Sequence, residues 1–240
     1  MALISIEEVC TGVRLGLWRM EEEPEELLSG FPHLRLLEMP YKYPARQKEF
    51  LCVRALLLAM TGDPTLRIEH TESGRPVLAG DCKSPGKDGT DGEVKTLTTE
   101  QRWQVSISHT KGYAALMLSK EEGAELNEQD SLQRHVAVGV DIEYRSDRVA
   151  KIASHYIRPD EKAETLEQML VLWCAKETLY KLHSDDNLQF FEMRAVAPPD
   201  GNELMLENMK RGRQVKVHVI PAPDYVLTWA VDFERLSLIV

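Results

Sequence analysis

Three acidic residues and two lysines, gathered in two short segments, are the residues best suited to chemistry in this chain. Asp141 and Glu143 end an apolar stretch that reads VGVDIE. Further along, Glu177 stands between Lys176 and Lys181 in the stretch WCAKETLYK. Carboxylate oxygens suit Mg²⁺, which in proteins often shares its remaining positions with phosphate oxygens. The pattern therefore suggests a magnesium–diphosphate site, and phosphoryl transfer is the first hypothesis.

The spacing of Asp141 and Glu143 places both carboxylates on one face of a strand, because side chains two residues apart point the same way. Two such carboxylates repel each other unless a cation lies between them. An isolated Asp-x-Glu is more often a solvent-facing strand end. Here the preceding residues are almost all apolar, which indicates burial and favours a functional site.

Residues 164–183 have the periodicity of a helix, with one stripe expected to face inward. The stripe consists of Leu166, Leu170, Trp173, Glu177 and Tyr180. On a surface helix, Glu177 and Lys181 would form an ordinary ion pair worth only about 0.3 kcal/mol. An acid on a buried stripe needs a partner instead, and a metal ion shared with the two strand carboxylates would supply one.

Ser108 and His109 end an alternating strand-like segment, residues 105–109. The hydroxyl and the imidazole could hydrogen-bond a phosphate. They could equally cap a turn, with the hydrogen bonds of the histidine made inside the protein, which is the commoner situation. No acid stands at a spacing that suggests a serine-hydrolase triad.

Three arginines are further candidates for binding anions. Arg75 and Pro76 follow a glycine in a turn that could approach a nucleotide, although such a sequence alone is merely a turn. Arg46 and Arg54 lie two turns apart on an expected helix. Helix arginines are usually solvated, so these two need independent support.

Composition sets limits on the function. The 240 residues carry 29 Lys and Arg against 39 Asp and Glu, a net charge of −10, which argues against nucleic acid as the main partner. No apolar run approaches the ~20 residues needed to span a bilayer, so no membrane association is expected. We expect no signal peptide, and four cysteines without metal-type spacing favour a reducing, cytoplasmic location.

The expected elements alternate between strands and helices. Strands are predicted at residues 3–20, 66–70, 105–109, 113–118, 136–142, 190–191, 215–220, 225–231 and 236–240. Helices are predicted at residues 21–26, 45–60, 149–156 and 164–183, with a solvated loop at 80–100 and a linker at 119–134. Each half of the chain thus holds strands and one long helix, which predicts an α+β, pseudo-duplicated architecture.

Taken together, these segments resemble the 4′-phosphopantetheinyl transferases of the Sfp-like type. The resemblance runs through residues 74–76, 105–110, 138–143 and 173–181, in the family's order and approximate spacing. It implies a pseudo-two-fold duplicated fold in which each half is a small sheet packed on a long helix. Residues 1–134 would bind the 3′-phosphate and adenine side of coenzyme A, and residues 135–240 would hold the metal and diphosphate.

The activity that this resemblance implies is of the holo-[acyl-carrier-protein] synthase type. The 4′-phosphopantetheine group of coenzyme A would pass to a serine of an acyl or peptidyl carrier protein, releasing adenosine 3′,5′-bisphosphate. Asp141, Glu143 and Glu177 match the family's Mg²⁺ ligands, and Glu177 would also help to deprotonate the serine. Lys181 matches the lysine that contacts the diphosphate, and Lys176 adjoins it.

The remaining coenzyme A contacts follow from the same resemblance. Ser108 and His109 match residues near the 3′-phosphate. Arg46 lies near the family's 3′-phosphate arginine, and Arg54 is the second candidate. The turn at residues 74–76 would line the adenine side, where many relatives have lysine in place of arginine.

Other functions compete with this hypothesis. One is a non-catalytic coenzyme A or nucleotide-binding protein on the same fold, which the presence of all three acids disfavours. Another is a metal-dependent phosphohydrolase, which would need more His and Asp ligands than the sequence offers. A third is a structural interaction module. A monomer is expected, because two complementary halves in one chain suffice. The sequence does not choose the carrier.

Overall fold

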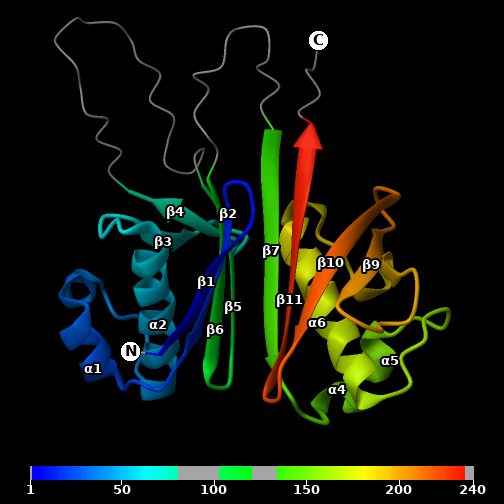
Figure 1. Ribbon diagram of the computed structural model, residues 1–240, viewed down its shortest axis with the longest axis horizontal. Coiled ribbons are helices and arrows are strands. Elements are labelled where there is room, and N and C mark those ends of the chain that lie inside the picture. The colour runs from blue at the N-terminus through cyan, green and yellow to red at the C-terminus, as the bar shows by residue number, and fades with distance from the viewer. Residues whose placement is uncertain (1, 81–102, 121–133, 236–240) are drawn as a thin grey trace, which may run out of the picture.

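The structure is a computed structural model that describes residues 2–80, 103–120 and 134–235. It is a mixed α/β protein in which two antiparallel sheets lie next to each other, each with a long helix on its outer side (Figure 1). The predicted strand at 236–240 lies outside the described residues. So do most of the predicted loop at 80–100 and of the linker at 119–134.

The first sheet consists, in spatial order, of β1 (Leu3–Cys10), β2 (Val13–Arg19), β6 (Tyr113–Lys120) and β5 (Trp103–Thr110). Helix α2 (Pro44–Thr61) packs on it. Pro44 suits the first turn of this helix, and Gly62 ends it in the left-handed conformation at φ 69°. The buried side chains between α2 and the sheet form one core, which includes Leu51, Leu56 and Leu116.

The second sheet consists, in spatial order, of β7 (Arg134–Tyr144), β11 (Tyr225–Arg235), β10 (Arg213–Pro221), β9 (Glu203–Asn208) and β8 (Met193–Ala195). Helix α6 (Leu166–Leu182) packs on it and begins with a capping box between Thr165 and Gln168. A Cβ added at Gly139 would lie 2.5 Å from the carbonyl oxygen of Thr178, so this glycine lets α6 approach β7. That approach places the carboxylates of both elements on one surface.

Shorter elements complete the chain. They are the hairpin of β3 (Arg67–His70) and β4 (Pro76–Ala79), the α-helices α1 (Pro24–Gly30), α4 (Arg148–Lys151) and α5 (Ala153–Tyr156), and the 3₁₀ turns η1 (Pro32–Leu36), η2 (Ser184–Asp186) and η3 (Phe190–Glu192). The β3–β4 hairpin and η2 lie at the edges of the cavity described below.

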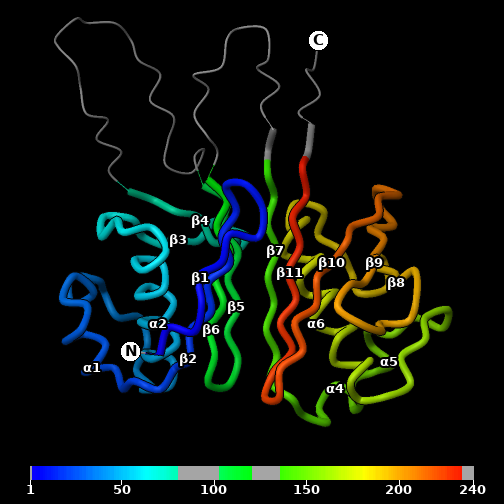
Figure 2. Tube along the Cα trace, in the orientation of Figure 1, coloured from blue at the N-terminus to red at the C-terminus, as the bar shows by residue number. Residues whose placement is uncertain are grey.

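The two sheets meet where β5 lies beside β7 (Figure 2). Val138, Val140 and Ile142, the alternate residues of β7, join a third core with side chains of the first sheet. Beside this core, three hydroxyls of β5 accept hydrogen bonds from backbone amides of β7. The pairs are Val140 N to Ser106 Oγ at 3.0 Å, Ile142 N to Ser108 Oγ at 3.3 Å and Tyr144 N to Thr110 Oγ1 at 3.1 Å. We call these three bonds the hydroxyl seam.

The structure corrects several sequence predictions. Residues 190–191 form a 3₁₀ turn rather than a strand, residues 149–156 form two short helices, and β9 was not predicted. The expected inward stripe of α6 is wrong at its ends, because Leu166 is 52% exposed and Tyr180 is 40% exposed. The buried face instead follows residues 170, 171, 174, 175, 178, 179 and 182. Small side chains at 174, 175 and 178 allow the closest approach to the sheet.

Candidate active site

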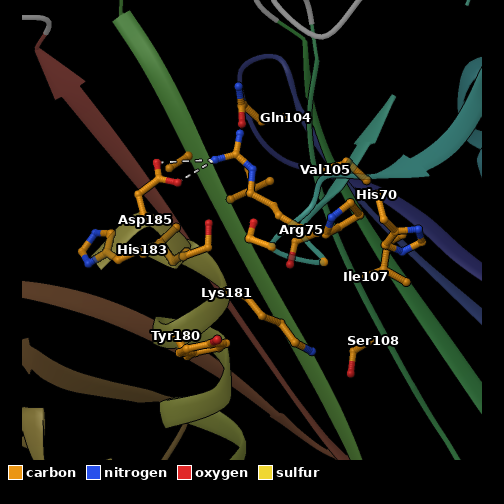
Figure 3. Close-up of a pocket in the computed structure, with 18 of the residues that line it drawn as sticks. His70, Arg75, Gln104, Val105, Ile107, Ser108, Tyr180, Lys181, His183 and Asp185 are labelled. Atoms are coloured by element: carbon orange, nitrogen blue, oxygen red, sulfur yellow. Dashed lines mark hydrogen bonds and ion pairs between the residues drawn. The ribbon is translucent and has the colours of Figure 1, made fainter. Parts of the chain in front are cut away.

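A cavity of about 970 Å³ opens between the two halves of the molecule (Figure 3). Its walls come from the β3–β4 turn, from β5, from β7 and from the end of α6 with the turn that follows. Ser108, His109, Arg75 and Lys181 all line it, although they are far apart in the sequence. Five of the eleven predicted site residues thus line one cavity, with Pro76 as the fifth, whereas Arg46, Arg54, Asp141, Glu143, Lys176 and Glu177 are not among its lining residues.

Asp141 is the most enclosed carboxylate of this region, with only 4% of the residue exposed. Its Oδ1 accepts two hydrogen bonds, one from Ser108 Oγ at 2.7 Å and one from Lys181 Nζ at 2.7 Å. Lys181 Nζ also donates to the carbonyl oxygen of Val140 at 3.1 Å. The second oxygen, Oδ2, is buried and meets no N–H or O–H donor among the described residues, and the fully buried thiol of Cys174 lies close to this carboxylate. A buried carboxylate oxygen in this state is costly and is suited to receive a cation.

Glu143 and Glu177 are both close enough to Asp141 for its charge to affect their pKa values. Burial, with the charge of Asp141 next and that of Glu143 smaller, raises the pKa of Glu177 to about 7, while Lys181 opposes the shift. Burial and then Asp141 likewise raise the pKa of Glu143, although Trp173 Nε1 donates to Glu143 Oε1 at 3.0 Å. The charge of Asp141 thus disfavours the ionisation of both glutamates, and three carboxylates against one lysine form a site with an excess of acidic groups.

The donor chemistry of these carboxylates suits a hard divalent cation such as Mg²⁺. Across residues 2–80, 103–120 and 134–235, however, no group of three or more His, Cys, Asp and Glu side chains is arranged to hold a metal ion as it stands. Lys181 occupies Oδ1 of Asp141. The orphaned Oδ2 of Asp141 and the raised pKa values of the two glutamates still fit a cation, so we keep the three carboxylates as candidate ligands.

Lys176 does not belong to this site. Its side chain is fully buried, and Nζ donates to Glu161 Oε2 at 2.7 Å, to the carbonyl oxygen of Tyr156 at 2.7 Å and to that of Phe190 at 3.3 Å. An ammonium has three N–H donors, and all three are engaged. The predicted contact with coenzyme A is therefore corrected, because five residues along a helix turn the side chain of Lys176 away from that of Lys181.

The two helix arginines have different surroundings. Arg46 donates to Glu49 Oε2 at 2.8 Å, and the same oxygen lies 3.7 Å from His109 Nδ1. Burial lowers the pKa of His109, which Glu49 opposes and the charges of Arg46 and Lys181 reinforce. Arg46 is thus within electrostatic range of the cavity, and His109 connects it to the carboxylate cluster.

Arg54 lies elsewhere. It donates to the carbonyl oxygens of Phe50 at 3.1 Å and Ile68 at 3.3 Å, and its guanidinium carbon lies 3.3 Å from the centroid of the Phe50 ring. Burial lowers its pKa to about 10. The structure does not bring Arg54 to the cavity, so Arg46 is the candidate that we retain.

Arg75 and Pro76 line the cavity where the β3–β4 turn approaches the end of α6. Arg75 Nη1 lies 3.2 Å and 3.4 Å from the two carboxylate oxygens of Asp185, so an ion pair joins the two halves at this edge (Figure 3). Neither Asp185 nor the hydrogen bond from Trp173 was predicted from the sequence. The only signal for Asp185 was an acidic pair directly after the long helix.

A comparison with family models finds one region of similarity. Residues 137–230 match the model of the 4′-phosphopantetheinyl transferase superfamily. The matched segment contains most of β7 and all of α6, and hence Asp141, Glu143, Glu177 and Lys181. The similarity supports a transferase. No curated protein matches the chain. Among the described residues, no helix is long and apolar enough to cross a membrane.

Proposed function

We propose that this protein transfers the 4′-phosphopantetheine group of coenzyme A to a serine of an acyl or peptidyl carrier protein, in a Mg²⁺-dependent reaction of the Sfp-like type. The observation that carries the proposal is the carboxylate cluster on β7 and α6, which lies within the segment that matches the superfamily and has a buried oxygen without a partner. The second product would be adenosine 3′,5′-bisphosphate.

In this reaction the serine oxygen forms a bond to the phosphorus nearest the pantetheine, and the P–O bond to adenosine 3′,5′-bisphosphate breaks. Glu177, the partly buried carboxylate of α6, accepts the serine proton. Two of the three N–H donors of Lys181 point at Asp141 and Val140, so the third can bind a diphosphate oxygen. Asp141, Glu143 and Glu177 would hold Mg²⁺, which when bound offsets the charge of the diphosphate.

The first half would bind the adenosine end of coenzyme A. His109 lines the cavity and Arg46 lies behind it, on the other side of Glu49, and the two residues would bind the 3′-phosphate. Arg75 and Pro76, from the β3–β4 turn, also line the cavity and would contact the adenine side. An arginine there provides a planar, bidentate donor group rather than the point charge of a lysine.

We also propose that the fold is internally duplicated, with halves at residues 1–134 and 135–240. Each half has an antiparallel sheet with one long helix on its outer side. Each also has a glycine beneath that helix. A Cβ at Gly16 would lie 2.5 Å from Met60 Sδ, as one at Gly139 would crowd Thr178. Such a chain would act as a monomer, and the free thiols of Cys10, Cys52 and Cys174 fit a reducing cytoplasm.

The direct test is incubation with coenzyme A, Mg²⁺ and apo carrier proteins, followed by mass spectrometry of the carriers. We expect a mass increase of one phosphopantetheine on at least one acyl or peptidyl carrier, and none with chelator or with Asp141→Asn. No increase on any carrier, with folded protein, would refute the proposal. Coenzyme A binding without transfer would instead indicate a non-catalytic binding protein, and carrier-independent hydrolysis would indicate a phosphohydrolase.

The assignment of the 3′-phosphate can be tested separately. Arg46→Ala should weaken the binding of coenzyme A more than the binding of 3′-dephospho-coenzyme A, because a charge-assisted contact to phosphate contributes about 1.5–3 kcal/mol. Isothermal titration with both ligands measures the difference. Arg54→Ala serves as the control from the same helix and should weaken the two ligands equally. Equal losses for Arg46→Ala would remove this residue from the phosphate site.

A further inference from the structure

The hydroxyl seam contains one member with an additional contact. The hydroxyls of Ser106, Ser108 and Thr110 each accept a hydrogen bond from a backbone amide of β7. Of these three, only Ser108 also donates to a carboxylate within the described residues. Ser108 is 7% exposed, and Ser106 is 3% exposed, so both hydroxyls are enclosed by protein. The extra bond of Ser108 therefore marks a role that its neighbour does not have.

The hydroxyl of Ser108 makes two hydrogen bonds, one as acceptor and one as donor, and together they fix the direction of its single proton. Its oxygen accepts from Ile142 N at 3.3 Å, and its proton goes to Asp141 Oδ1 at 2.7 Å. A serine hydroxyl offers a single donor, so it cannot donate to a phosphate oxygen while this bond is made. The arrangement argues against the expected donation from Ser108 to the 3′-phosphate of coenzyme A.

The effect on Asp141 is to distinguish its two oxygens. Oδ1 receives two donors, one from β5 in the first half and one from α6 in the second. Oδ2 is buried without a partner in the described part of the chain. Two donors on one oxygen fix the rotation of the carboxylate and keep the other oxygen oriented for a ligand, which lowers the cost of organising a binding site.

We propose that Ser108 is a positioning residue that holds Asp141 in the orientation in which Oδ2 can bind a divalent cation. The inference rests on the proposed function, because it takes Asp141 as a metal ligand. It adds that the metal site depends on a residue of the first half, outside the segment that matches the transferase superfamily. The hydroxyl seam then does more than join the two sheets, because the bond from Ser108 makes the orientation of the Asp141 carboxylate depend on the position of β5.

Ser106→Ala is a matched control for Ser108→Ala. Both substitutions remove a buried hydroxyl from the same strand, and both leave one amide of β7 without its acceptor. Their effects on stability should therefore be similar. Only Ser108→Ala also releases Asp141, so only this variant should alter the binding of a metal ion. Ser108→Thr retains the hydroxyl and should restore the wild-type behaviour.

The experiment measures Mn²⁺ binding to the purified full chain by electron paramagnetic resonance of the free ion, with urea unfolding of the same samples. We expect Ser108→Ala to bind Mn²⁺ about tenfold more weakly than Ser106→Ala, the size of effect seen when a residue behind a metal ligand is removed. Ser108→Thr should bind within about twofold of wild type on the same basis. Titration with coenzyme A and its 3′-dephospho form should show no selective loss in Ser108→Ala.

Two results would overturn the inference while the proposed function stands. The first is equal Mn²⁺ affinity of Ser108→Ala and Ser106→Ala in a wild-type background that binds Mn²⁺ and modifies a carrier. The second is a selective loss of coenzyme A over 3′-dephospho-coenzyme A in Ser108→Ala, which would make Ser108 a phosphate contact. A wild-type protein that neither binds Mn²⁺ nor modifies any carrier would overturn both proposals.

Discussion

Two charged clusters on the same helix differ in how completely their polar atoms are satisfied. Around Lys176, the ammonium has three acceptors, and Glu161 in turn accepts the amides of Arg158 at 2.8 Å and Ala195 at 2.6 Å. Burial lowers the pKa of Lys176, and the bond to Glu161 opposes the shift. Charges of opposite sign balance, so nothing in this cluster is left for a ligand.

Around Lys181, the balance is different. One lysine faces Asp141, Glu143 and Glu177. Burial and then the charge of Asp141 raise the pKa of both glutamates, and one oxygen of Asp141 has no hydrogen-bond partner among the described residues. The comparison shows that a buried charge is not itself a sign of function. A cluster in which every charge and polar atom has a partner supports the fold. A cluster with surplus charge and an unpartnered oxygen is suited to bind a ligand.

The largest expected effect separates the two clusters by activity. Glu177→Gln should lower carrier modification by roughly 10²–10⁴-fold, because it removes the proposed base and one metal ligand. Glu161→Gln should leave the activity per folded molecule near that of wild type. Quantitative mass spectrometry of the carrier, with circular dichroism to count folded protein, measures both. Near-normal turnover of Glu177→Gln would remove this residue from the site.

The second prediction separates the clusters by stability. Lys176→Met should destabilise the fold by about 3–5 kcal/mol, because it leaves the buried carboxylate of Glu161 without its counter-ion. Lys181→Met should cost less, since Lys181 is 25% exposed and Asp141 keeps the bond from Ser108. Urea unfolding gives both free energies. A larger loss for Lys181→Met would reverse the comparison.

The third prediction concerns pH in chelator, without added metal. The pKa of Glu177 is raised in the fold from 4.5 to about 7, so the folded state disfavours its charge. The wild type is then free of this penalty below pH 4.5 and loses stability as the pH rises through 7. Glu177→Gln should therefore be more stable than wild type by roughly 3 kcal/mol at pH 8, given a pKa raised from 4.5 to about 7 and about 1.4 kcal/mol per pKa unit, with no difference near pH 4.

A control for this pH effect comes from the turn before the same helix. Glu164 is exposed, and Glu164→Gln should change stability by the same small amount at pH 4 and pH 8. The measurement is the urea midpoint of wild type, Glu177→Gln and Glu164→Gln at several pH values between 4 and 8. A wild type that is no less stable than Glu177→Gln at pH 8 would contradict the proposed charge excess.

The smallest effect is expected at the rim of the cavity. Asp185→Asn removes the exposed partner of Arg75 and should change stability by less than about 1 kcal/mol. The freed guanidinium should tighten coenzyme A binding by up to about fivefold, since a Coulomb energy near 1 kcal/mol is typical in water. Asp186→Asn is the contrasting variant. It weakens bonds to Asn208 and Arg211 and should reduce stability instead.

Local patterns predicted much of the fold. Strand-like apolar segments located β5, β6, β7, β10 and β11, and helical periodicity predicted a helix at residues 45–60, close to the observed α2. The same patterns mistook residues 190–191 for a strand, because a short apolar pair fits either a strand or a turn. Asp141 and Glu143 could be placed on one face of a strand from their spacing alone.

Long-range contacts decided the rest. Lys176 and Lys181 occur in one motif, yet they lie about 140° apart around the helix, and only the packing of α6 shows which faces the cavity. The choice of Arg46 over Arg54, and the bond from Ser108 to Asp141, likewise depend on segments brought together by folding. The sequence by itself determined which residue types are present and how they are spaced along each element. The tertiary structure decided which of them have unsatisfied charge, because that depends on partners distant in the chain.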